Sequence, residues 1–81
     1  MKFKYGYRAA AQLAALQVRM QKRIADKMRF FASQQDPKMF AKRIVGEKLY
    51  RFRVGDYRII CDIGKDEIWV HLIERRDKAY N

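Results

Sequence analysis

Two parts of this sequence carry the candidate residues for chemistry on an anion: Arg51, Arg53 and Arg58 in one, and Arg75, Arg76 and the phenol of Tyr80 in the other. A guanidinium holds a phosphate through two parallel N–H donors and keeps its charge at neutral pH. Fixed donors of this kind also stabilise the charge that develops on phosphate oxygens during cleavage. These residues therefore indicate chemistry on a phosphate backbone.

Other kinds of catalytic site find little support in the sequence. Cys61 is the single cysteine, which excludes a disulfide framework or a cysteine-rich zinc site and favours a reducing, cytoplasmic setting. Asp56 and Asp66 fall in predicted turns and Asp62 stands alone, so paired carboxylates are missing. His71 lies between two apolar residues and is interpreted as semi-buried, with a general base as the alternative. We predict no cofactor and no metal.

A hairpin is predicted to bring the first three arginines together. The runs Leu49 to Val54 and Tyr57 to Ile63 alternate in character and flank a Gly-Asp pair, which is typical of a hairpin turn. Because successive side chains of a strand point to opposite faces, Arg51, Arg53 and Arg58 should share the face opposite the core. We expect no balancing acid beside them, so this face should bind an anion, with a solvated outer face as the alternative.

Helical patterns fill the first half of the chain. The first begins near Tyr7 and continues through an alanine-rich run, and the second extends from about Val18 to Ser33. The sequence leaves open whether they form two helices or one bent rod, although two suit a short chain better. Asp36-Pro37 should end this region, and Lys38 to Val45 is predicted to form a turn of helix or a covering loop.

The expected fold is a single α+β domain over residues 1–81, with an N-terminal strand, a helical hairpin and then an antiparallel sheet. The helices should cover one face of the sheet. The last strand is apolar on both faces and should be central. The predicted strands are Lys2 to Tyr5, Lys48 to Val54, Tyr57 to Ile63 and Ile68 to Ile73.

Charge narrows the class of partner. Nineteen Lys and Arg against nine Asp and Glu give a formal net charge of +10 on 81 residues. A folded domain this basic is expected to meet nucleic acid, an anionic membrane or an acidic protein. The longest apolar run in the sequence is much shorter than the roughly 20 residues that a membrane span needs, and no signal-peptide pattern is present. We therefore expect no membrane association.

The chain resembles the RelE branch of the RelE/ParE toxins of toxin–antitoxin modules. The resemblance rests on the hairpin Leu-Tyr-Arg-Phe-Arg-Val-Gly-Asp-Tyr-Arg-Ile-Ile-Cys-Asp-Ile, the closing Arg-Arg-Asp-Lys-Ala-Tyr and the alanine-rich first helix. It implies an endoribonuclease that cuts messenger RNA in the ribosomal A site. It also implies that a cognate antitoxin neutralises the toxin.

The resemblance also implies roles for individual residues. Arg58 falls at the position of the transition-state arginine. Arg76, with Arg75 as the alternative, falls where a C-terminal arginine contacts the scissile phosphate, and Tyr80 matches the tyrosine that stacks on the substrate base.

Arg51 and Arg53 occupy positions where lysines or arginines line the first hairpin strand, so the resemblance implies that they bind RNA. Two alternatives remain at this point. One is a ParE-like toxin that inhibits DNA gyrase, and the other is a catalytically inert, basic nucleic-acid-binding relative.

Overall fold

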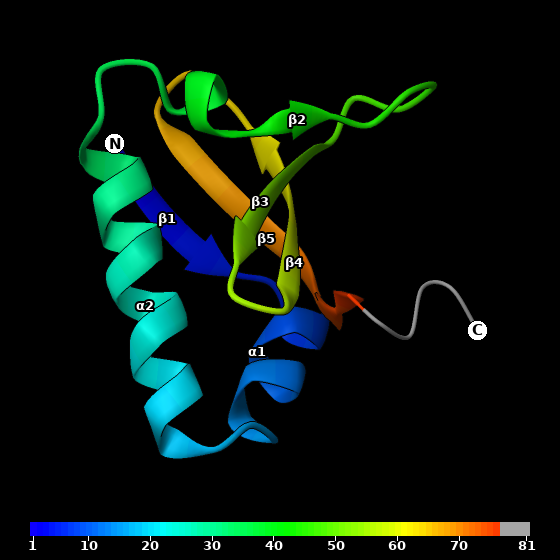
Figure 1. Ribbon diagram of the computed structural model, residues 1–81. Helices are drawn as coiled ribbons and strands as arrows, with labels where there is room; N and C mark the ends of the chain where they lie inside the picture. The colour runs from blue at the N-terminus through cyan, green and yellow to red at the C-terminus, as the bar shows by residue number, and fades with distance from the viewer. Residues whose placement is uncertain (77–81) are drawn as a thin grey trace.

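Within residues 1–76, which the computed structural model describes, the chain forms one mixed sheet with helices packed on one of its faces (Figure 1). The strands follow in the order β1-β5-β4-β3-β2, and every neighbouring pair is antiparallel except β1 and β5. Their bounds are Lys2–Tyr5 for β1, Lys42–Arg43 for β2, Tyr50–Val54 for β3, Tyr57–Ile63 for β4 and Glu67–Arg75 for β5. The predicted fold class and the central position of the last strand are confirmed.

The helical region divides into α1 (Tyr7–Ala14) and α2 (Val18–Ser33), which answers the question that the sequence left open. Gln17, at the N-cap of α2, is extended with ψ of 148°, so the chain turns without a proline. The side-chain amide of Gln21 donates to the carbonyl oxygen of Leu16 over 2.8 Å. This bond satisfies one carbonyl in the turn after α1, where helix ends lack partners.

The core lies between the helices and the inner face of the sheet. Ile24 and Met28 of α2 are fully buried with Phe52 of β3 and Ile59 of β4. Phe31 stacks on Phe52 with ring centroids 4.2 Å apart. Stacked aromatic pairs contribute about 0.5–1.5 kcal/mol beyond the area that they bury. This packing determines which face of β3 and β4 meets the core. The opposite face carries the arginines together with the buried Ile60.

The segment before the hairpin begins with a turn of helix, as predicted, but then continues as a strand. It forms a 3-10 helix, η1 (Pro37–Phe40), and then the short strand β2, which the sequence did not reveal. Asp36 caps η1 by accepting from the backbone N–H of Lys38, and Pro37 is preorganised for the first helical position. A strand of two residues is too short to show an alternating pattern, which explains why it was missed.

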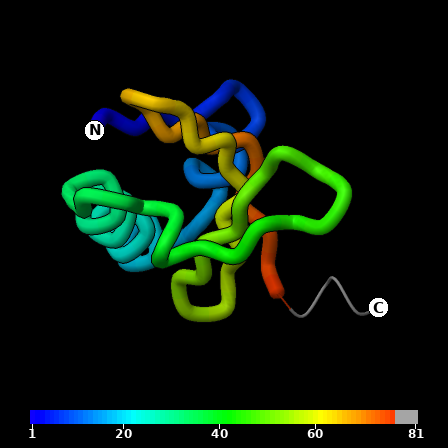
Figure 2. The backbone as a smooth tube through the Cα atoms, turned by 90° about the horizontal axis from the view of Figure 1, so that it is seen from above, coloured from blue at the N-terminus to red at the C-terminus, as the bar shows by residue number. Residues whose placement is uncertain are grey.

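The strand boundaries also differ slightly from those predicted. β3 begins at Tyr50 rather than Lys48, because the backbone before it turns through Gly46, whose φ is +81°. The connection that contains this turn extends away from the sheet in both views (Figures 1 and 2). β5 continues to Arg75, beyond the predicted end at Ile73, because it stays paired with β4 along its whole length.

Neither helix in the described part of the chain is long and apolar enough to cross a membrane.

Candidate functional site

Arg51, Arg53 and Arg58 lie on the outer face of the sheet and are called the arginine face below. The register places Arg53 directly opposite Arg58 across the β3–β4 hairpin, with Arg51 two residues further along β3. Residues directly opposite in an antiparallel pair share a face, with Cβ atoms about 4.5–5.5 Å apart. Arg51 and Arg58 are half-buried, whereas Arg53 is exposed. The sheet therefore brings these guanidinium groups to one surface, as the alternation predicted.

The turn of the hairpin makes this close pairing possible. Gly55 has a φ of +58°, in the left-handed region that glycine adopts without steric cost. The turn lets Val54 pair with Tyr57, so that Arg53 and Arg58 form the next pair of the ladder. Like charges directly opposite each other destabilise a sheet. The pairing of Arg53 with Arg58 therefore has an electrostatic cost unless a nearby negative charge offsets it.

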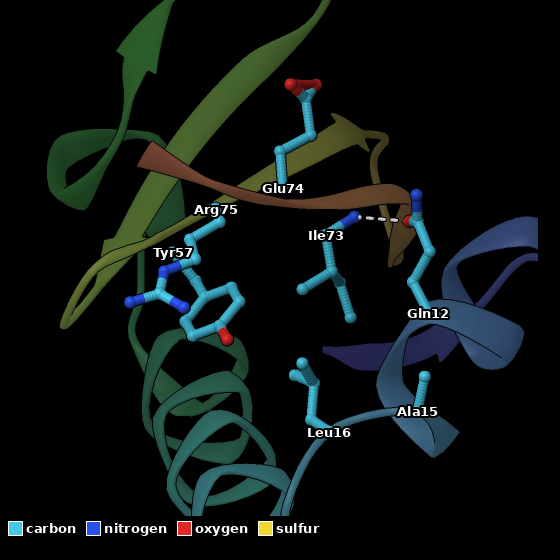
Figure 3. Close-up of a pocket in the computed structure, with 7 residues that line it drawn as sticks. All are labelled: Gln12, Ala15, Leu16, Tyr57, Ile73, Glu74 and Arg75. Carbon is cyan, nitrogen blue, oxygen red and sulfur yellow. Dashed lines mark hydrogen bonds between the residues drawn. The ribbon is translucent and has the colours of Figure 1, made fainter. Parts of the chain in front are cut away.

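The expectation of no acid beside the arginines is wrong. Glu74 of β5 lies directly opposite Arg58 and is half-buried. In Figure 3 its side chain points to the opposite side of β5 from Ile73. The predicted strand ends at Ile73, which leaves Glu74 outside the predicted sheet. One carboxylate thus borders the arginine face on its β5 side.

A lysine that the sequence analysis did not single out borders the arginine face on its other side. Lys42 of β2 lies opposite Arg51 and is exposed. Because β2 is so short, only the structure could show that this lysine joins the sheet.

The C-terminal arginines lie apart from each other. Arg75 pairs with Tyr57 and therefore faces the helix side of the sheet, away from Arg58 (Figure 3). Arg76 is exposed, and its backbone N–H donates to the carbonyl oxygen of Asp56 over 2.6 Å. This bond holds Arg76 beside the hairpin turn, near the Arg53–Arg58 pair. Tyr80 lies outside the described residues.

A comparison with models of protein families places the chain in a family. Residues 4–80 match the family model described as the ParE toxin of the type II toxin–antitoxin system parDE. The chain belongs to the ParE toxin family. This membership confirms the resemblance to RelE/ParE toxins at the level of the superfamily. No curated protein sequence matches the chain.

Solved structures support the fold of this ParE-family chain. It is similar to a chain of the RelB–RelE antitoxin–toxin complex from Methanococcus jannaschii, with 23% identity, a TM-score of 0.73, and 94% of this chain and 93% of that chain covered. It is equally similar to a chain of the archaeal RelE–RelB complex from Pyrococcus horikoshii OT3, with 22% identity, a TM-score of 0.73 and 93% of each chain covered. At this identity the likeness establishes the fold.

A hollow of about 470 Å³ separates α1 from the end of β5 in this ParE-family fold (Figure 3). Its floor includes Leu16 and Ile73, and Arg75 lies at its side next to Tyr57. Oε1 of Gln12 accepts from the backbone N–H of Ile73 over 2.7 Å. Arg75 therefore belongs to this hollow and lies away from the arginine face.

His71 occupies a β-bulge. Ile60 pairs with Leu72 whereas Cys61 pairs with Val70, so His71 is the extra residue of β5. It is half-buried, as predicted, and its ring centroid lies 6.3 Å from that of Trp69. Its role as a structural histidine rather than a base stays a prediction.

The buried thiol of Cys61 is unsuited to nucleophilic chemistry. Burial, together with the charge of Asp62, raises the pKa of the Cys61 thiol to about 12. A thiolate is the reactive form of cysteine, so this side chain is inert at neutral pH. Among residues 1–76, no cluster of His, Cys, Asp and Glu has an arrangement that could hold a metal ion.

Proposed function

We propose that this toxin is an endoribonuclease that cuts messenger RNA in the ribosomal A site. The observation that carries the proposal is the Arg53–Arg58 pair, with Arg51 beside it on the same face of the sheet. Arginine forks match phosphate geometry, and like charges directly opposite each other favour the binding of a further anion. The RelE names of the similar structures support the same activity.

In the proposed reaction, the 2′-oxygen of a nucleotide attacks the adjacent phosphorus. The 2′-hydroxyl loses its proton, the bond to the 5′-oxygen of the next nucleotide breaks, and that oxygen takes up a proton. The products are a 2′,3′-cyclic phosphate, which can open to the 3′-phosphate, and a free 5′-hydroxyl. Arg58 and Arg76 would stabilise the charge on the non-bridging oxygens, as fixed donors do in oxyanion sites.

Arg51 and Arg53 would anchor the RNA backbone and favour the ionised form of the 2′-hydroxyl. Arginine stays protonated in proteins and cannot accept the 2′-proton. Activation of the nucleophile would therefore come from the surrounding positive charge and from positioning on the ribosome. Tyr80 would stack on a neighbouring base, a contact worth about 1–3 kcal/mol on single strands.

We also propose that a cognate antitoxin neutralises the toxin through a negatively charged segment. The net charge of +10 and the exposed Arg53 and Lys42 support an acidic partner. The similar structures are, by their names, antitoxin–toxin complexes. Co-purification with the product of a neighbouring gene should weaken as salt rises, because screening reduces electrostatic association. Failure to form a complex at low salt with either neighbouring product would count against the partner.

A second candidate function is inhibition of DNA gyrase. The observation that favours it is the match over residues 4–80 to the ParE toxin family. In that case the toxin would act without cutting RNA, and the arginine face would bind the antitoxin.

Substitution of Arg58 separates the two functions. Loss of one transition-state donor typically lowers the rate by about 10² to 10³. Arg58→Ala should therefore abolish growth arrest on induction and translation-dependent cleavage, while the fold and antitoxin binding stay largely intact. Arg51→Ala should leave partial activity, and His71→Gln should have little effect. Arg19→Ala is the matched control, because it removes an exposed arginine of α2 that is not part of the arginine face.

If Arg58→Ala arrests growth as strongly as the unmodified toxin, the arginine-centred mechanism is wrong. A supercoiling assay with purified gyrase then tests the second candidate directly.

A further inference from the structure

A second hollow, of about 440 Å³, lies beside the arginine face where η1 runs into β2 at the edge of the sheet. One side of it is apolar and the other is cationic. Of the described residues that line it, none is acidic. The lining consists of Met39, Phe40, Ala41, Lys42, Arg51 and Arg53. This hollow, called the η1 hollow below, shares Arg51 and Arg53 with the arginine face.

The aromatic side of the η1 hollow is held rigidly. The ring of Phe40 meets that of Phe30 edge-on, with centroids 5.4 Å apart at 84°, and lies 6.2 Å from that of Phe31. Phe31 in turn stacks on the fully buried Phe52. Phe40 nevertheless keeps 46% of its surface exposed, and Met39 keeps 81%. The core thus supports an aromatic ring whose free surface lies beside arginine side chains.

We propose that the η1 hollow holds one unpaired nucleotide of the RNA strand, next to the scissile phosphate. The base would lie on Phe40 and Met39, and its phosphate would contact Lys42 and Arg51. This inference rests on the proposed RNA substrate. It adds a binding subsite that the sequence analysis did not contain.

The composition of the η1 hollow favours a single strand of RNA as its occupant. Proteins that bind single strands combine cationic grooves with aromatic rings on which bases stack. The hollow falls within the range of about 300–1,000 Å³ that holds small ligands. Its shared arginines also make it continuous with the arginine face. A strand that places one phosphate at Arg58 would therefore meet Arg51 and the hollow on its way along β3.

Binding of a short, uncleavable RNA tests the subsite. A 2′-deoxy substitution at each nucleotide that precedes a cleavable bond removes the attacking 2′-oxygen and so blocks cleavage. Fluorescence anisotropy then measures the affinity of the protein for this RNA at several salt concentrations. Phe40→Leu keeps apolar bulk but removes the ring, so affinity should fall by roughly 5- to 100-fold, the range of base stacking. Phe40→Trp should restore binding. Tyr7→Leu is the matched control, since Tyr7 is 90% exposed on α1 and should have no effect.

Salt dependence separates stacking from charge. Each phosphate contact on a single strand contributes about 0.7 to the slope of log affinity against log salt. Phe40→Leu should leave this slope unchanged, whereas Arg51→Ala should reduce it by about 0.7. With an abasic oligonucleotide of the same length, Phe40→Leu and the unmodified protein should bind equally. Thermal denaturation of each variant shows that the fold is retained.

Other outcomes would overturn the subsite. Unchanged RNA affinity in Phe40→Leu excludes it, even where Arg58→Ala abolishes cleavage and the proposed function holds. Loss of antitoxin binding with unchanged RNA affinity assigns the hollow to a protein partner instead. Conversely, binding that depends on Phe40 but without any cleavage on ribosomes would support the subsite and refute the proposed function.

Discussion

Gln12 takes the place of a missing strand along one edge of β5. β1 pairs with β5 only as far as Val70, where the N–H of Gly6 donates to the carbonyl oxygen of Val70 over 2.7 Å. Beyond that point the chain enters α1, and Oε1 of Gln12 accepts from the N–H of Ile73. A buried backbone N–H needs a partner, and Ile73 is only 5% exposed. The helix therefore completes the hydrogen bonding of the central strand (Figure 3).

Gln12→Leu is expected to destabilise the protein by about 1–2 kcal/mol. Leaving a buried donor unsatisfied costs about 1–3 kcal/mol. The lower part of that range applies, because Gln12 lines the hollow between α1 and β5, from which water can reach the freed N–H. For a domain of this size, about 1 kcal/mol corresponds to a shift of about 4–8 °C in Tm. We therefore expect Tm to fall by about 5–15 °C.

Urea denaturation followed by circular dichroism measures this cost. Gln12→Glu is the matched control, because it keeps an acceptor oxygen at the same distance along the side chain, and it should retain most of the stability. Gln12→Leu should lower the midpoint without changing the m-value, because the folded surface is preserved. If Gln12→Leu is as stable as the unmodified protein, or if Gln12→Glu is equally destabilised, the bond to Ile73 does not hold the strand.

Two further predictions concern charge. Glu74→Gln should tighten binding of the uncleavable RNA by about 2- to 5-fold at low salt, because a carboxylate roughly 8 Å from a phosphate repels it by about 0.5–1 kcal/mol. The gain should disappear at high salt, and unchanged affinity at low salt would show that Glu74 does not act on the arginine face. Burial raises the pKa of the Cys61 thiol from an ordinary 9.0 to about 12. Between these two pH values the folded protein keeps a proton that the unfolded chain loses, so the free energy of unfolding should fall as the pH rises from 9 to 12. Relative to Cys61→Ala, the free energy of unfolding of the unmodified protein should fall by up to about 1.4 kcal/mol per pH unit in that range. If the free energies of unfolding of the two proteins change with pH in parallel, burial of the thiol has no such effect.

The hairpin could be predicted from the sequence because its pattern is local. Alternation over β3 and β4 fixes which side chains face the core, and one Gly-Asp turn sets the register between the strands. The placement of Arg51, Arg53 and Arg58 on one face follows directly from those two features. The apolar character of β5 on both faces likewise indicated a central strand, which the structure confirms.

Residues brought to the site by long-range pairing could not be predicted in the same way. Glu74 joins the arginine face only because β5 extends past Ile73 and pairs with Arg58 across the sheet. Lys42 joins it through a strand too short to leave a pattern. Phe40 lies in the segment Lys38 to Val45, for which the sequence predicted only a turn of helix or a loop, because its contacts with the end of α2 are tertiary.

The arginine face also has a physical cost that bears on function. Arg53 and Arg58 are like charges directly opposite each other, an arrangement that destabilises a sheet by roughly 0.2–1 kcal/mol. Glu74, opposite Arg58, offsets part of the local charge, whereas Lys42, opposite Arg51, adds to it. A ligand that binds only the folded state raises the free energy of unfolding and so offsets this destabilisation. An anion along β3 would therefore stabilise the fold. Under the proposed function, a messenger RNA strand and an acidic antitoxin segment would each supply that charge, and their competition for β3 would be the physical basis of neutralisation.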